Sequence, residues 1–191
     1  MAESIVRSHD SLTAGLPRIW VGFILAGVIL VGEVLAVISE EGSSPGSAGP
    51  LVFLLAVLAA WIYWLYCVFR FHDAIGSVPG YRHPITPAKA VALHFVPLFN
   101  FYWTFRWPSK IALFVNWRTQ TNSMMGWIPG VLVLGSVITM RIVDGFVGAL
   151  LLFSAGAYIS ARIRRAARAA PVPGSAMAPP GYTRILPLSC G

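Results

Sequence analysis

The residue with the clearest chemical potential is Glu33, an acid in the middle of the apolar run Ile19–Ile38. A carboxylate at the centre of a membrane helix costs about 2.5–3.5 kcal/mol on insertion scales, so we expect it to face protein rather than lipid. It could relay a proton or cation, or balance the charge of a ligand. We favour a structural role, as half of an ion pair or as a protonated acid bonded to a neighbour. The candidate partners are His94, Tyr63, Thr139 and Arg141, and Arg141 is preferred because both groups should lie in the outer half of the membrane.

Three histidines, His72, His83 and His94, are spaced by 11 residues. This spacing would place them on one face of a continuous helix, but the Gly- and Pro-rich segment Gly76–Pro87 between them excludes such a helix. We therefore interpret the spacing as coincidence. His94 by itself could ligate haem or a metal, or titrate near pH 6.5. A single membrane histidine is more often a hydrogen-bonded packing residue, so we predict no cofactor, no metal site and no catalytic residue.

Four arginines, Arg162, Arg164, Arg165 and Arg168, follow the last apolar run. Basic residues at the end of a membrane helix mark the cytoplasmic side and attract anionic lipid. We expect these four side chains to contact lipid headgroups.

The composition explains why these polar residues are so few. The chain has 191 residues, of which 57% are hydrophobic and 11% charged, with a mean hydropathy of +0.71. Soluble domains carry about 25% charged residues, so this chain is predicted to be an integral membrane protein. Its formal net charge is +7, but the basic residues gather at the ends of apolar runs, which favours lipid headgroups over nucleic acid as partners.

The apolar runs predict an all-α membrane protein with four transmembrane helices, a re-entrant or Pro-kinked fifth element and an interfacial amphipathic helix. Runs of about 20 apolar residues are long enough to cross a bilayer. The two chain ends are expected to be a short cytoplasmic tail and a disordered Pro/Ala-rich tail. The expected segments are 1–16 (tail), 17–39, 51–71, 124–140 and 146–161 (spans), 88–107 (re-entrant or kinked element), 108–121 (interfacial helix) and 169–191 (tail).

The element 88–107 is interrupted by Pro97 and Asn100. Proline removes a backbone donor and disfavours helix at the preceding residue, and asparagine can bond freed backbone groups at a turn. If every run crossed, eight of the 14 basic residues would lie outside; if this element returns to its starting face, only Arg141 does. We therefore favour a re-entrant element over a fifth span, with both termini cytoplasmic.

Two short segments in this region resemble a known pattern. Residues 85–91, which contain Pro87-Ala88-Lys89-Ala90-Val91, and residues 95–103 are similar to the core P-x-K-A-V…F-x-P-x-x-N-x-Y-W of a family of small uncharacterised bacterial polytopic membrane proteins. The resemblance implies the architecture of a small polytopic membrane protein and a location in the bacterial inner membrane. It implies no activity.

No motif names a reaction, so we predict a non-enzymatic membrane protein: an accessory or scaffold subunit of a membrane complex, or a lipid-organising protein. Small residues at helical spacing in the last run, from Gly145 to Ser160, would let another helix pack closely, within the chain by default or in a partner. The alternative is a small transporter or channel that uses Glu33 to couple transport. In that case the candidate ligand- or ion-binding residues are Glu33, His94, Asn100 and Arg141.

Overall fold

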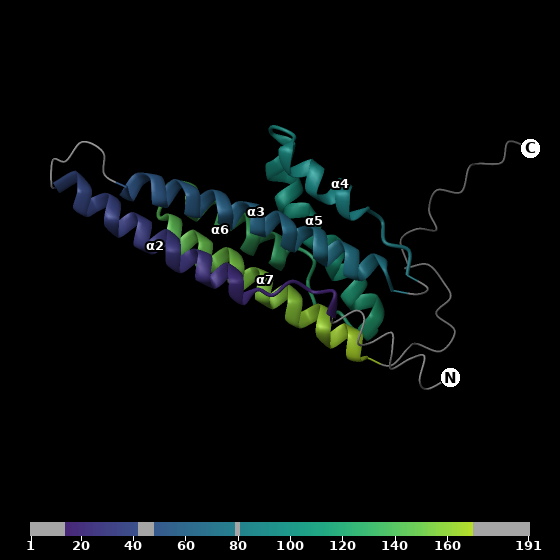
Figure 1. Cartoon of the computed structure of the whole chain (residues 1–191). Coiled ribbons are helices and arrows are strands. Elements are labelled where there is room, and N and C mark those ends of the chain that lie inside the picture. The colour runs from purple at the N-terminus through teal and green to yellow at the C-terminus, as the bar shows by residue number, and fades with distance from the viewer. Residues whose placement is uncertain (1–13, 42–47, 79–80, 170–191) are drawn as a thin grey trace, which may run out of the picture.

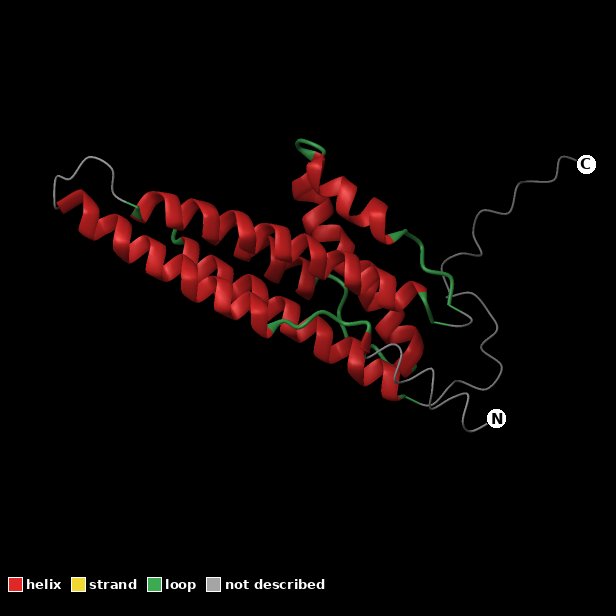
Figure 2. Cartoon of the chain, in the orientation of Figure 1, coloured by secondary structure: helices red, strands yellow, loops and turns green. Residues whose placement is uncertain are grey.

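The structure, a computed structural model, describes residues 14–41, 48–78 and 81–169. Within these ranges every regular element is a helix and no strand occurs (Figure 2). The all-α prediction is confirmed. Most of the two predicted tails lies outside the described residues. The helices are α2 (Trp20–Glu41), α3 (Gly49–Gly76), α4 (Pro87–Ala92), the 3-10 helix η1 (Leu93–Phe95), α5 (Phe99–Thr119), α6 (Ile128–Ile142) and α7 (Gly145–Arg168).

Three of these helices, α2, α3 and α7, are long and apolar enough to cross a membrane. They run alongside one another in the bundle, with α2 antiparallel to the other two (Figure 1). Large aliphatic side chains of α2 and α3 are exposed along the bundle, as expected of surfaces that face lipid. The chain is therefore compatible with a membrane-embedded protein.

The fourth predicted span corresponds to α6, which has 15 residues. At 1.5 Å per residue it is about 22 Å long, shorter than a hydrocarbon core of about 30 Å. It packs against α7, and the predicted small-residue face of α7 is buried inside the chain. On that face, Gly156 lies against Trp64 of α3 and Gly145 against Glu33 of α2. Helix packing within the chain therefore accounts for these small residues.

Helix α7 approaches α6 closely at Gly148. A Cβ atom at this position would meet the backbone of Met140 well inside van der Waals contact, whereas a Cβ atom at Gly135 would meet nothing within 4 Å. We expect Gly148→Ala to lower the free energy of unfolding by about 1–3 kcal/mol because the helices must separate. Gly135→Ala, on the same helix pair, should raise it by about 0.5–1 kcal/mol through helix propensity. Unfolding in mixed micelles measures both, and equal effects would contradict the close approach.

The segment between α3 and α6 forms a helical hairpin that projects from the side of the bundle (Figure 1). Thr86 caps α4, and the chain reverses after η1 at residues 96–98, where Leu98 has a φ of 62°. The N–H of Asn100 donates to the carbonyl of Val96 at 3.0 Å, and the indole N–H of Trp103 donates to the carbonyl of Ala90 at 2.8 Å. Helix α5 therefore folds back on α4 at the predicted break.

The prediction that residues 88–107 and 108–121 form two separate elements is wrong. Helix α5 continues through Pro108, which is buried within it. A proline inside a helix costs about 3 kcal/mol, because it removes a hydrogen bond and crowds the preceding turn. Side chains on both sides of the proline, including Trp107 and Ile111, are buried in the core. Tertiary packing of this face explains why the helix does not end at Pro108.

Candidate functional site

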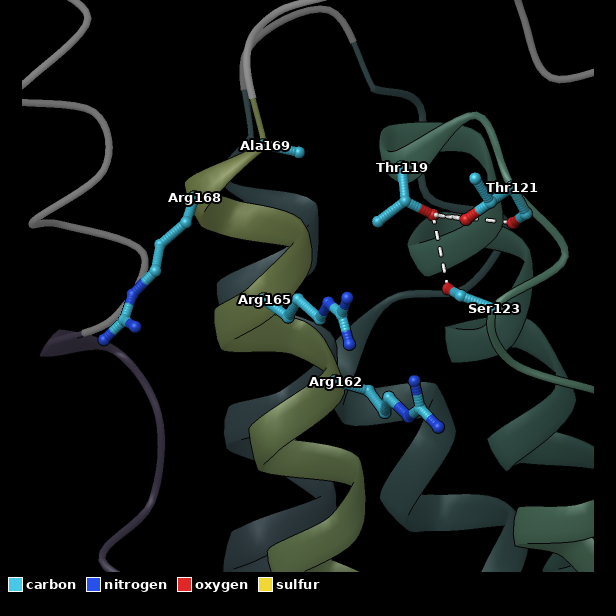
Figure 3. A pocket seen from close by; sticks show the side chains of 7 residues that line it. All are labelled: Thr119, Thr121, Ser123, Arg162, Arg165, Arg168 and Ala169. Atoms are coloured by element: carbon cyan, nitrogen blue, oxygen red, sulfur yellow. Dashed lines mark hydrogen bonds between the residues drawn. The ribbon is translucent and has the colours of Figure 1, made fainter.

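A pocket of about 440 Å³ lies where α5 ends beside the last turns of α7 (Figure 3). It is at the end of the bundle where α3 and α7 finish, which we call the basic end. Here the side chain of Arg70 donates to the carbonyl of Gly15 at 2.8 Å, so the segment entering α2 is close by. The pocket is lined by Thr119, Thr121, Ser123, Arg162, Arg165, Arg168 and Ala169.

One wall of the pocket consists of three hydroxyl groups. Helix α5 ends where Gln120 takes a left-handed conformation with a φ of 52°. The hydroxyl of Thr121 donates to that of Thr119 at 2.9 Å, and the hydroxyl of Ser123 lies 3.3 Å from the same oxygen. The loop is held further by Asn116, whose amide makes two hydrogen bonds of 2.8 and 2.9 Å to the backbone of Met124.

The other wall consists of arginines from α7. Arg162, Arg165 and Arg168 are spaced by three residues, so they follow one side of the helix. Figure 3 shows Arg162 and Arg165 extending toward the three hydroxyls, whereas Arg168 extends away from them. The guanidinium of Arg162 lies 5.0 Å from the centre of the Tyr158 ring, a cation–π distance that restrains the side chain. Arg164, which was predicted with the other three, does not line the pocket.

Among the residues that the structure describes, no acidic side chain lines this pocket, and no ion pair joins its three arginines to a carboxylate. The last turn of α7 tolerates these neighbouring positive charges because a helix C-terminus carries partial negative charge. Guanidinium groups bind phosphate and carboxylate through paired hydrogen bonds, whereas the hydroxyl protons of Thr119 and Thr121 are already donated within the protein. The pocket therefore has the chemistry of a site for a phosphate-bearing or carboxylate-bearing anion.

Glu33 lies at the opposite end of the bundle, against the start of α7. Its Oε1 accepts a hydrogen bond of 3.2 Å from the N–H of Phe146. Gly145 permits this approach, because a Cβ atom there would lie 2.6 Å from the same oxygen. A carboxylate at a helix N-terminus satisfies backbone donors and interacts favourably with the helix dipole. Asp144 caps the same helix through the N–H of Val147 at 2.7 Å.

The preferred partner of Glu33 was therefore incorrect. Arg141 is exposed, and no ion pair joins it to Glu33. The N–H groups in the first turn of a helix have no partner within that helix. In α7, the N–H of Phe146 donates to the carboxylate of Glu33 instead. The contacts of Glu33 favour the structural role over a coupling role.

Substitutions of Glu33 separate these two roles. Glu33→Gln retains an oxygen that can accept from Phe146, so the free energy of unfolding should change by less than about 1 kcal/mol. Glu33→Leu leaves the N–H unpaired and should cost about 1–3 kcal/mol. Unfolding in mixed micelles measures both. A large loss in Glu33→Gln would instead indicate that the charge itself is required.

His94 and Asn100 belong to the hairpin rather than to a common site with Glu33. The Nδ1 atom of His94 is 2.9 Å from the carbonyl of Ala90, and the ring is buried. The side chain of Asn100 accepts from the hydroxyl of Thr104 at 3.1 Å. No hydrogen bond or ion pair joins any two of Glu33, His94, Asn100 and Arg141, all of which are described residues.

The structure brings the three histidines into one region although, as predicted, no continuous helix joins them. The Nδ1 atom of His72 lies 2.6 Å from the Nε2 atom of His83. The rings of His72 and His94 both pack on Trp107, with centroid distances of 5.8 and 6.5 Å. No continuous helix is needed, because the loop after α3 returns His83 to the end of α3, and η1, next to the tip of the hairpin, places His94 against Trp107.

Comparisons of this chain with protein-family models, with curated proteins and with solved structures found no match. The resemblance of residues 85–103 to a bacterial family therefore stays a prediction. The functional argument rests on the geometry of the chain itself.

Proposed function

We propose that this chain is a non-enzymatic membrane protein that binds phosphate-bearing anionic lipid headgroups at its basic end and so organises lipid around the bundle. The observation that carries the proposal is the pocket, whose described lining comprises three arginines, three hydroxyl-bearing residues, one alanine and no acidic residue. An anion there relieves the repulsion among the arginines and accepts hydrogen bonds from their guanidinium groups. A position at the end of the apolar bundle is where headgroups lie.

The proposed placement in the membrane follows from charge and exposed apolar surface. With the basic end in the cytoplasm, Arg162, Arg165 and Arg168 obey the positive-inside rule, and Arg141 lies on the far side. The hairpin tip fits a re-entrant element, because Leu98 is 86% exposed and Phe101 is 59% exposed. We further propose that α6 completes a fourth span beside α7 and that the membrane is the bacterial inner membrane.

The exposed aliphatic faces of α2 and α3 suit a partner's helices as well as lipid tails. The role of an accessory or scaffold subunit therefore remains compatible with lipid binding. The contacts of Glu33 do not favour the transporter alternative, because its carboxylate is engaged by the N-terminus of α7.

The proposal is tested by native mass spectrometry of the protein released from nanodiscs. We expect phosphatidylglycerol or cardiolipin to be retained and phosphatidylcholine to be lost, with less retention at high salt. A parallel titration with inorganic phosphate separates a headgroup site from a site for free phosphate, since only the latter binds without acyl chains. Equal retention of anionic and zwitterionic lipids would contradict the proposal.

A further inference from the structure

The buried polar atoms with no protein partner are concentrated in one place. Of the five such side-chain atoms in the described part of the chain, four belong to His72, His83, His94 and Trp107. His72 and Trp107 are fully buried and His94 is 7% exposed. These residues come from α3, from the loop after it, from η1 and from α5. We call this group the histidine cluster.

The hydrogen bonds of the cluster determine which atoms are donors. The carbonyl of Ala90 only accepts, so His94 carries its proton on Nδ1 and presents a lone pair on Nε2. The 2.6 Å bond between His72 and His83 contains one proton. If both rings are neutral, one of the two outer atoms, His72 Nε2 or His83 Nδ1, is a donor and the other is an acceptor. With the indole N–H of Trp107, the open atoms comprise two donors and two acceptors.

We propose that the histidine cluster encloses bound water that connects His94 and Trp107 to the His72–His83 pair, and that this site exchanges protons through the pair. Each unpaired buried group costs about 1–3 kcal/mol, which favours a ligand that satisfies several of them. Water provides two donors and two acceptors, the same inventory as the open atoms. A buried water usually makes about three such bonds.

A metal ion fits this inventory less well. A cation cannot satisfy the indole N–H of Trp107 or the outer N–H of the imidazole pair. No group of three or more His, Cys, Asp or Glu side chains that could hold a metal is found among the residues that the structure describes. Both observations favour water.

Proton exchange through the pair is balanced. When His72 Nε2 takes a proton from one bound water, the Nδ1 proton of His72 passes to His83 Nε2, and His83 releases its Nδ1 proton to the connected water. That proton returns to the hydroxide left by the first transfer, so one O–H bond forms for each that breaks, and the reverse sequence restores the first tautomer. Two titratable side chains lie near the cluster. The ring centre of Tyr81 is 5.9 Å from that of His83. The positive charge of Lys110 acts on His83, and Arg106 lies near Lys110.

The experiment uses the full chain, labelled with ¹⁵N-histidine and ¹⁵N-tryptophan, in lipid nanodiscs. We expect a magnetisation transfer from water to the indole proton of Trp107. We also expect a scalar coupling between His72 and His83 nitrogens and ¹⁵N shifts of both rings averaged between tautomers. Trp103 is the matched control, because its indole N–H is bonded to Ala90 and should show no transfer. The coupling should be lost in His83→Asn.

Two results would overturn the inference. One is a single fixed tautomer of the pair together with no transfer from water to Trp107. The other is a stoichiometric transition metal in the purified protein that is lost in His94→Gln, which would make the cluster a cation site. The tautomers, the transfer from water and the metal content are all measured on the wild-type chain, and only the assignment of a metal to the cluster uses His94→Gln.

Discussion

Replacing Arg162 and Arg165 together by glutamine is expected to weaken the retention of anionic lipid about 30-fold. A basic side chain at the headgroup level contributes about 1 kcal/mol, so two contribute about 2 kcal/mol. These two side chains extend toward the hydroxyls of Thr119, Thr121 and Ser123. Glutamine keeps a polar side chain that can form hydrogen bonds, but it is shorter than arginine and carries no charge. Exchange of bound phosphatidylglycerol against phosphatidylcholine, followed by native mass spectrometry, measures the change.

The matched control for this variant is Arg164→Gln. Arg164 is exposed on the same turn of α7 and does not line the pocket. It should change retention by less than about threefold, since it contributes only to the diffuse field of the basic end. An equal loss in both variants would show that lipid responds to the total charge of this end and not to a pocket.

The long apolar helices were predictable because the capacity to cross a membrane depends on local composition. The runs that contain α2 and α3 are apolar over the length of a bilayer, and the breaks around them are rich in Gly, Pro and Ser. The reversal near Pro97 was also predictable from the local sequence, because proline restricts the backbone of its own and the preceding residue. The limit of this reasoning is Pro108, where packing of α5 outweighs the local preference.

The two polar sites were predicted only in part, because their residues meet through long-range contacts. The arginine wall was recognised from its charge, but the hydroxyl wall of Thr119, Thr121 and Ser123 was missed. The only sequence signal for that wall is a short polar stretch that is also typical of an ordinary loop. The histidine cluster was missed because its members are 11 residues apart and meet only when the hairpin folds back.

Acidification from pH 6.5 to pH 4 is expected to destabilise the fold by about 3 kcal/mol through His83. Burial, reinforced by the positive charge of Lys110, lowers the pKa of His83 from 6.5 to about 4. Above pH 6.5, His83 is neutral in both the folded and the unfolded state, so it does not make the free energy of unfolding depend on pH. Between pH 6.5 and 4, His83 binds a proton in the unfolded chain but not in the folded chain. The free energy of unfolding therefore falls by about 1.4 kcal/mol per pH unit. Below pH 4 both states are protonated and the loss is complete.

The substitution that isolates this effect is His83→Asn. Its side chain can still bond the Nδ1 atom of His72 but does not titrate, so the pH dependence attributable to His83 should disappear while stability near pH 7.5 changes little. Unfolding in mixed micelles at pH 7.5, 6, 5 and 4, followed by tryptophan fluorescence, measures the slope for both proteins. The buried rings of Trp107 and Trp64, whose centres are 6.0 Å apart, report loss of this core. Parallel curves for the two proteins would mean that another group is responsible for the acid sensitivity and that the loop after α3 is not held by a neutral imidazole.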